Sequence, residues 1–137
     1  PLAEIVSGHT GIGIEQLTLE RVLGGVLQPL AWALGIPWDE AQLAGSLIGQ
    51  KFILNEFVAY VSYSEVAGQL SVHSQAIVIF ALCGFANLSS IAILLGGIGS
   101  MAPNRRHDIA RLGMKAMIAA TLANLMSAAI AGVFISL

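Results

Sequence analysis

The stretch that decides the fold is Gly49–Tyr60, with the sequence GQKFILNEFVAY. It places Lys51, Asn55 and Glu56 inside a chain whose mean hydropathy is +0.81. A charged side chain near the centre of a bilayer costs about 3 kcal/mol on insertion scales, and such residues usually face a cavity, a partner or a transport path. Glu56 is therefore the first candidate functional residue.

The composition around this stretch predicts a membrane protein. The chain has 137 residues, of which 56% are hydrophobic and only 10% are charged, whereas soluble domains carry roughly 25% charged residues. The run Ala76–Leu95 is almost wholly apolar and matches the roughly 20 residues that cross a hydrocarbon core. We therefore expect an all-α integral membrane protein.

Several other classes of site and partner are not expected. A net charge of −2 with six basic residues lacks the massed Lys and Arg of a nucleic-acid-binding surface. His9, His73 and His107 are far apart, so no metal site and no cofactor is predicted. Cys83 is the only cysteine, which excludes an internal disulfide. The start Pro1–Glu4 lacks the pattern of a signal peptide and is interpreted as the beginning of a piece of a longer chain.

The segment 41–66 is predicted to be a re-entrant hairpin. Its two apolar parts, 41–54 and 57–66, are each too short to cross a bilayer, and Asn55-Glu56 separates them. Short half-helices joined by a polar tip are tolerated only where the tip is buried in protein or lines a watery cavity. The tip at 55–56 is therefore expected near the midplane.

Two ordinary transmembrane helices are predicted on either side of this hairpin. The first covers 17–36, with Thr18 as its N-terminal cap, and the last covers 107–137; residues 1–16 receive no assignment. Most of the basic residues lie beside the loop before the last helix: Arg105, Arg106, Arg111 and Lys115. The positive-inside rule places this loop in the cytoplasm. Small residues repeat along the last helix and predict a tight packing face: Ala119, Ala123, Ser127 and Ala131.

The segment 75–96 is predicted to be a discontinuous transmembrane helix. Its centre, Cys83–Ser90, holds small and polar residues where lipid-facing leucines would be expected. Transporters use helices broken in this way to offer half-helix ends and freed backbone groups to substrates and ions.

The two motifs together resemble the concentrative nucleoside transporter family. The first is GQK followed by NEFVAY in Gly49–Tyr60, and the second is ALCGFANLSSI in Ala81–Ile91. The resemblance implies that the chain is the C-terminal half of a multi-pass symporter built from inverted repeats. It also implies that this symporter assembles as a homotrimer in the plasma membrane, here the bacterial inner membrane. It also implies that the other hairpin and most of the site for the coupling ion, Na⁺ or H⁺, belong to an N-terminal half absent from this sequence.

The resemblance further implies a set of site residues. Glu56, Asn87 and Ser90 would contact the ribose of a nucleoside such as uridine, while Phe85 and Asn55 would line the pocket. An ionised carboxylate suits ribose hydroxyls because it accepts charge-assisted hydrogen bonds.

Simpler interpretations remain open for these residues. Glu56 can instead pair with Lys51 and fix the hairpin, Asn87 and Ser90 can tie helices together, and Phe85 can be a packing residue. At the level of function, the alternative to an ion-coupled nucleoside symporter is an ion channel or gate-like membrane module. An intramembrane enzyme is not expected, because no nucleophile with an adjacent base is visible.

Overall fold

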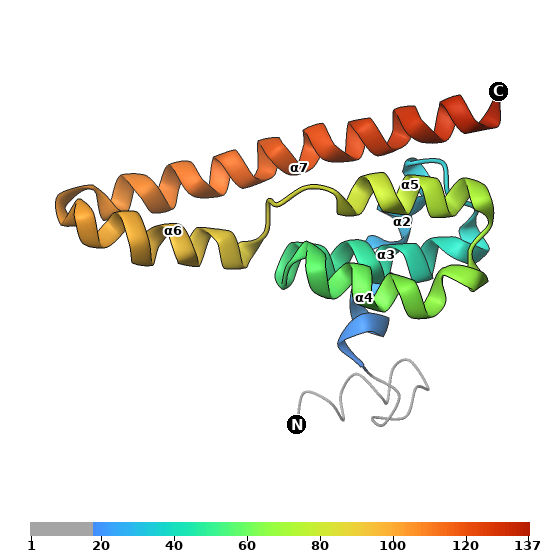
Figure 1. The fold of residues 1–137 in the computed structure, drawn as a ribbon, viewed down its shortest axis with the longest axis horizontal. Helices are drawn as coiled ribbons and strands as arrows, with labels where there is room; N and C mark the ends of the chain where they lie inside the picture. The colour runs from blue at the N-terminus through green and yellow to red at the C-terminus, as the bar shows by residue number, and fades with distance from the viewer. Residues whose placement is uncertain (1–17) are drawn as a thin grey trace.

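The structure is a computed structural model that describes residues 18–137, and within that range it is helical without strands (Figure 1). The prediction of an all-α chain is confirmed for these residues. In chain order the elements are α2 (Leu19–Ala33), α3 (Trp38–Ile53), α4 (Glu56–Val66), η2 (Ala67–Gln69), α5 (Val72–Leu82), α6 (Leu88–Met101), η3 (Pro103–Arg105) and α7 (Arg106–Ser136).

Helix α2 begins at the predicted cap Thr18 and ends just before Gly35. The Thr18 hydroxyl accepts a hydrogen bond from the backbone N–H of Arg21 at 3.3 Å, which caps the first turn. Beyond the last turn, Gly35 adopts φ +104°, a conformation that disfavours side chains with a Cβ. The helix has 15 residues, about 22 Å at 1.5 Å per residue. It is therefore shorter than the predicted range 17–36.

Glycines bring α2 and α3 into close backbone contact. A Cβ on Gly24 would lie 2.7 Å from the carbonyl oxygen of Gln42, and one on Gly49 would lie 2.7 Å from the Leu23 Cβ. Gly45 is also confined, though less tightly, with the Gly24 carbonyl oxygen 3.0 Å from its Cβ position. Small residues that allow backbones to approach are the usual basis of helix association in membranes. Among the described helices, α2 and α3 share the most extensive contact.

The predicted hairpin and the predicted discontinuous helix each consist of two helices. Within 41–66, α3 ends at Ile53 and α4 begins at Glu56. Within 75–96, α5 ends at Leu82 and α6 begins at Leu88, and Figure 1 shows the chain between them as an extended loop. We call residues 54–55 the hairpin break and residues 83–87 the helix break.

Helix α7 runs along both α5 and α6 (Figure 1). Among the described residues, the stretch Pro103–Ser136, of 34 residues, is the one helical segment long and apolar enough by length and composition to cross a membrane. Its buried face consists of Leu125, Ala128 and Gly132. Within the stripe of small residues predicted as a packing face, Ala119, Ala123 and Ser127 are exposed and Ala131 is half-buried. Helix α5 packs on the neighbouring face, so a packing role of the stripe stays a prediction.

That neighbouring face meets α5 at a close contact. A Cβ on Gly132 would lie 2.7 Å from the Ile77 Cδ1 atom. A hydrogen bond of 3.1 Å between His73 Nε2 and the Gly132 carbonyl oxygen also joins α5 to α7 at this point. The contact sets which side of α7 is buried.

Large apolar side chains remain uncovered on α6 and α7. Ile93 and Phe134 are each 72% exposed, and Leu122 is 62% exposed. Continuous apolar surfaces of this kind mark contact with lipid or with other protein.

Candidate functional site

The hairpin break is shaped by Asn55. This residue has an extended backbone, and its side-chain oxygen accepts a hydrogen bond from the Val58 N–H at 2.9 Å, which caps α4. Glu56 follows as the first residue of α4. The positive end of the helix dipole favours a carboxylate at that position.

The helix break is shaped by a second asparagine in the same role. The Asn87 side-chain oxygen accepts hydrogen bonds from the Ser90 N–H at 2.8 Å and from the Ser90 hydroxyl at 2.9 Å, which caps α6. Its amide nitrogen donates to the Phe85 carbonyl oxygen at 3.0 Å. The Ser90 hydroxyl also lies 3.0 Å from that carbonyl. Asn87 and Ser90 therefore hold the unwound chain in place.

The two breaks meet through side chains. The Asn87 amide nitrogen donates to a carboxylate oxygen of Glu56 at 3.3 Å, although the residues are 31 positions apart. Asn87 is 3% exposed and Glu56 is half-buried. Two helix N-termini, each capped by an asparagine, thus converge on one carboxylate and one amide.

The C-terminal ends of the broken elements gather a different set of polar groups. The Asn124 amide nitrogen donates to the carbonyl oxygens of Phe80 at 3.2 Å and Ala81 at 2.6 Å, near the end of α5. The Tyr60 hydroxyl donates to the Ile79 carbonyl oxygen at 2.9 Å. These side chains bind carbonyls in the last turn of α5, where most carbonyl oxygens lack a partner within the helix; the Phe80 oxygen also accepts from the Cys83 N–H at 3.3 Å. The signal in the sequence that could have identified Asn124 is an amide within an apolar helix.

Lys51 lies beside the same ends and is fully buried. Its Nζ atom has no hydrogen-bond partner among the described residues and lies 5.1 Å from the centroid of the Phe52 ring. No ion pair within 4.0 Å joins Lys51 to Glu56 in the described part of the chain. A direct ion pair between Glu56 and Lys51, the alternative interpretation of Glu56, is therefore not seen among the described residues.

The structure arranges the five predicted site residues in two groups. Glu56, Asn87 and Ser90 are linked by hydrogen bonds, as described above. The Asn55 side chain is used as a cap, and the Phe85 ring is 76% exposed at the edge of the helix break. Asn87 and Ser90 also line a cavity of about 200 Å³ between α6 and α7.

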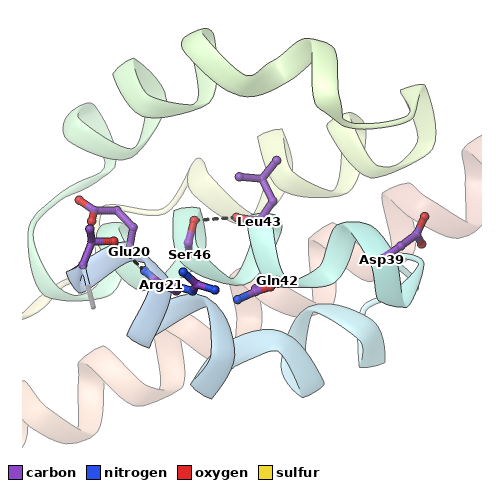
Figure 2. A pocket seen from close by; sticks show the side chains of 7 residues that line it. Glu20, Arg21, Asp39, Gln42, Leu43 and Ser46 are labelled. Carbon is purple, nitrogen blue, oxygen red and sulfur yellow. Dashed lines mark hydrogen bonds between the residues drawn. The ribbon is translucent and has the colours of Figure 1, made fainter. Parts of the chain in front are cut away.

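A separate polar hollow of about 320 Å³ lies along α2 and α3 (Figure 2). Figure 2 shows Glu20 and Arg21 on α2 near Ser46, with Asp39 towards the other end of α3. The Ser46 hydroxyl donates to the Leu43 carbonyl oxygen at 2.8 Å. This hollow shares no residue with either break, so it is distinct from the group around Glu56.

Polar groups at the facing breaks of a short hairpin and an interrupted helix are the arrangement of membrane transporters with discontinuous helices. The chain belongs to the family described as "Na+ dependent nucleoside transporter C-terminus", whose model matches residues 2–132. The match includes most of 1–16, the segment that received no assignment from the sequence. The predicted resemblance is therefore confirmed, and this is a family of membrane-embedded transporters and not of enzymes.

Known proteins similar to this chain are considerably longer. The uncharacterized transporter YutK of Bacillus subtilis is 58% identical over 132 residues, which cover 96% of this chain and 33% of that protein. The putative nucleoside permease NupX of Escherichia coli is 54% identical over 128 residues, covering 91% and 31%. A structure of CNTnw in an inward-facing substrate-bound state is similar with a TM-score of 0.82 and 53% identity, covering 99% and 33%. The chain thus spans about a third of the length of these relatives.

Proposed function

We propose that this chain is the ribose-binding part of a Na⁺-coupled nucleoside symporter. The observation that carries the proposal is the contact between the Glu56 carboxylate and the Asn87 amide, at the point where the N-termini of α4 and α6 converge. The description of the family favours Na⁺ over H⁺ as the coupling ion. The family membership also argues against the alternative of an ion channel or gate-like module.

The chemistry of the convergent groups suits the hydroxyls of a sugar. A ribose hydroxyl can donate to Glu56 and at the same time accept from the Asn87 amide or the Ser90 hydroxyl. The positive ends of two helix dipoles also favour oxygen atoms at this place. Hydrogen bonds to a charged group contribute about 1.5–3 kcal/mol. In this proposal Glu56, Asn87 and Ser90 bind the ribose, Phe85 lines the pocket, and Asn55 holds the tip of the hairpin.

The placement in the membrane follows the predicted segments. The hairpin 41–66 re-enters the bilayer, the broken helix 75–96 crosses it with its break near the midplane, and 107–137 spans it as α7. Segment 17–36 contributes α2, which is short for a complete span and packs on α3. The exposed apolar side chains of α6 and α7 support this placement, because lipid or neighbouring protein would cover them.

The complete protein is proposed to be a multi-pass transporter of the plasma membrane that assembles as a homotrimer from inverted repeats. Na⁺ binding, mainly by parts outside this chain, would stabilise the arrangement that accepts the nucleoside. The hairpin and the broken helix would then move as a unit between outward-open and inward-open states.

The experiment is uptake of radiolabelled uridine by the full-length protein in proteoliposomes. It compares an imposed Na⁺ gradient with a pH gradient, and the native protein with Glu56→Gln. Loss of a charged hydrogen bond of 1.5–3 kcal/mol corresponds to a fall in apparent affinity of roughly ten- to a hundredfold. Glu65→Gln is the matched control, since Glu65 lies on the same helix α4 and is exposed.

Opposite results would reject distinct parts of the proposal. Equal uptake and affinity in the Glu56→Gln and native proteins would reject the role of Glu56. Uptake driven by a pH gradient alone would reject Na⁺ coupling. A Na⁺ current in the absence of nucleoside, with no gradient-driven uptake, would favour the channel.

A further inference from the structure

A second feature near the two breaks is the burial of Lys51 beside the C-terminal ends of α3 and α5. Its side chain is 0% exposed, and its Nζ atom has no hydrogen-bond partner among the described residues. Burial of an unpaired ammonium is strongly unfavourable unless the surroundings carry a compensating negative potential. The Glu56 carboxylate acts on the ammonium from beyond ion-pair distance, and the groups that enclose the side chain add further negative potential.

Two helix ends add to the potential of the Glu56 carboxylate. Lys51 lies in the last turn of α3. A Cβ on Gly84, two residues beyond the end of α5, would lie 3.2 Å from the Lys51 Nζ atom. The C-terminus of a helix carries about half a negative charge on its carbonyls. The ammonium therefore lies beside the chain that leaves α5, and its own side chain comes from the last turn of α3.

The side chain of Asn124 supports the same assignment independently. Its amide carbon would lie 2.9 Å from a Cβ on Gly84, so the amide and the Lys51 ammonium flank the same glycine. The amide nitrogen donates to carbonyls at the end of α5. The absence of a side chain at Gly84 leaves room for both groups. Side chains from α3 and α7 thus converge on one helix end.

Charges are therefore sorted across the two breaks. The N-terminal ends of α4 and α6 hold the carboxylate of Glu56, and the C-terminal ends of α3 and α5 hold the ammonium of Lys51. Half-helix C-termini in transporters are places where free cations bind.

We propose that Lys51 is a tethered cation of the helix break. Its ammonium neutralises the negative ends of α3 and α5 and takes the place that a dissolved monovalent cation would otherwise fill. In this way Lys51 positions the hairpin break against the helix break without a bound ion. The role does not depend on which solute the transporter carries, and it is tested by stability instead of transport.

The test moves the charge from one helix to another in the purified full-length protein. Lys51→Met removes the charge and keeps a long apolar side chain. Asn124→Lys places an ammonium at the end of α5 from α7. The midpoint of thermal unfolding in detergent is measured for the native protein, both single variants and the double variant, with Lys115→Met on the exposed part of α7 as control.

The expected result is that the effect of Asn124→Lys on the unfolding midpoint changes sign when Lys51 is replaced by Met. Lys51→Met lowers the midpoint, and Asn124→Lys also lowers it in the native background because two ammonium groups repel each other. In the Lys51→Met background, Asn124→Lys raises the midpoint and recovers a substantial part of the loss. Lys115→Met leaves the midpoint unchanged. A double-mutant cycle isolates this interaction.

Other results overturn the proposal. A Lys51→Met protein as stable as the native one shows that the charge is not needed. A double variant less stable than Lys51→Met shows that volume, not charge, determines the effect. If Lys51→Met yields no folded protein, the double variant decides: recovery of folded protein supports the tethered cation, and continued failure to fold rejects it.

Discussion

Replacement of Gly24 by alanine tests the close packing of α2 and α3. The new Cβ would lie 2.7 Å from the Gln42 carbonyl oxygen and 3.4 Å from the Ser46 Cβ. The nearest atom belongs to the main chain of α3, so a side-chain rotation cannot relieve the contact. The two helices would have to move apart, and the neighbouring close contact at Gly45 would loosen with them.

The adjacent residue Gly25 provides a matched control. A Cβ there meets nothing within 4 Å, although both glycines lie inside α2. Each replacement gains about 0.5–1 kcal/mol because alanine favours a helix over glycine. Overpacking of a tight interface costs about 1–3 kcal/mol. The helix term is common to both variants, so the difference between them is the overpacking penalty alone.

The assay is equilibrium unfolding of the full-length protein in detergent, followed by tryptophan fluorescence. Trp32 and Trp38 contribute to the signal at the connection between α2 and α3, where their ring centroids are 6.3 Å apart. We expect Gly25→Ala to be as stable as the native protein or slightly more stable, and Gly24→Ala to be less stable than Gly25→Ala by about 1–3 kcal/mol. Equal stability of the two variants would refute the close approach.

Three further predictions concern the caps, the sugar and an acidic contact. Asn55→Ala should lower the free energy of unfolding by about 1 kcal/mol through loss of the cap on α4, measured against Ser64→Ala on the same helix; an equal effect of both would contradict the capping role. In uptake competition, 2′,3′-dideoxyuridine should inhibit far less than uridine, because unpaired buried polar groups cost about 1–3 kcal/mol; equal inhibition would argue against ribose binding. Burial raises the pKa of Glu40, but hydrogen bonds from Ser74 and Ser71 outweigh it and hold the folded pKa below its ordinary value. The resulting stability is complete above the unfolded pKa of 4.5 and is lost as the pH falls through the folded pKa. Acid unfolding of Glu40→Gln should therefore show a smaller loss of stability, and an unchanged profile would count against the contact.

The sequence by itself determined the helices and the places where they break. Thr18, Asn55 and Asn87 each lie at the start of a helix, and each caps it through a hydrogen bond to a residue three positions later. Such contacts depend only on the local chain, which is why residue type and spacing predict them. The motifs around Asn55 and Asn87 were also sufficient to identify the family, while the binding roles of Glu56, Asn87, Ser90 and Phe85 stay predictions.

Only the tertiary structure decided which of these polar residues meet. Glu56 contacts Asn87 across 31 positions, and Asn124 caps α5 from 43 positions away. It also decided that Lys51 is buried without a hydrogen bond, and that α7 packs through Leu125, Ala128 and Gly132. Periodicity shows that a helix has faces, but the face that becomes buried depends on the shape of the helix against it. Local hydrogen bonding sets where helices begin and end, whereas contacts between distant residues follow from packing.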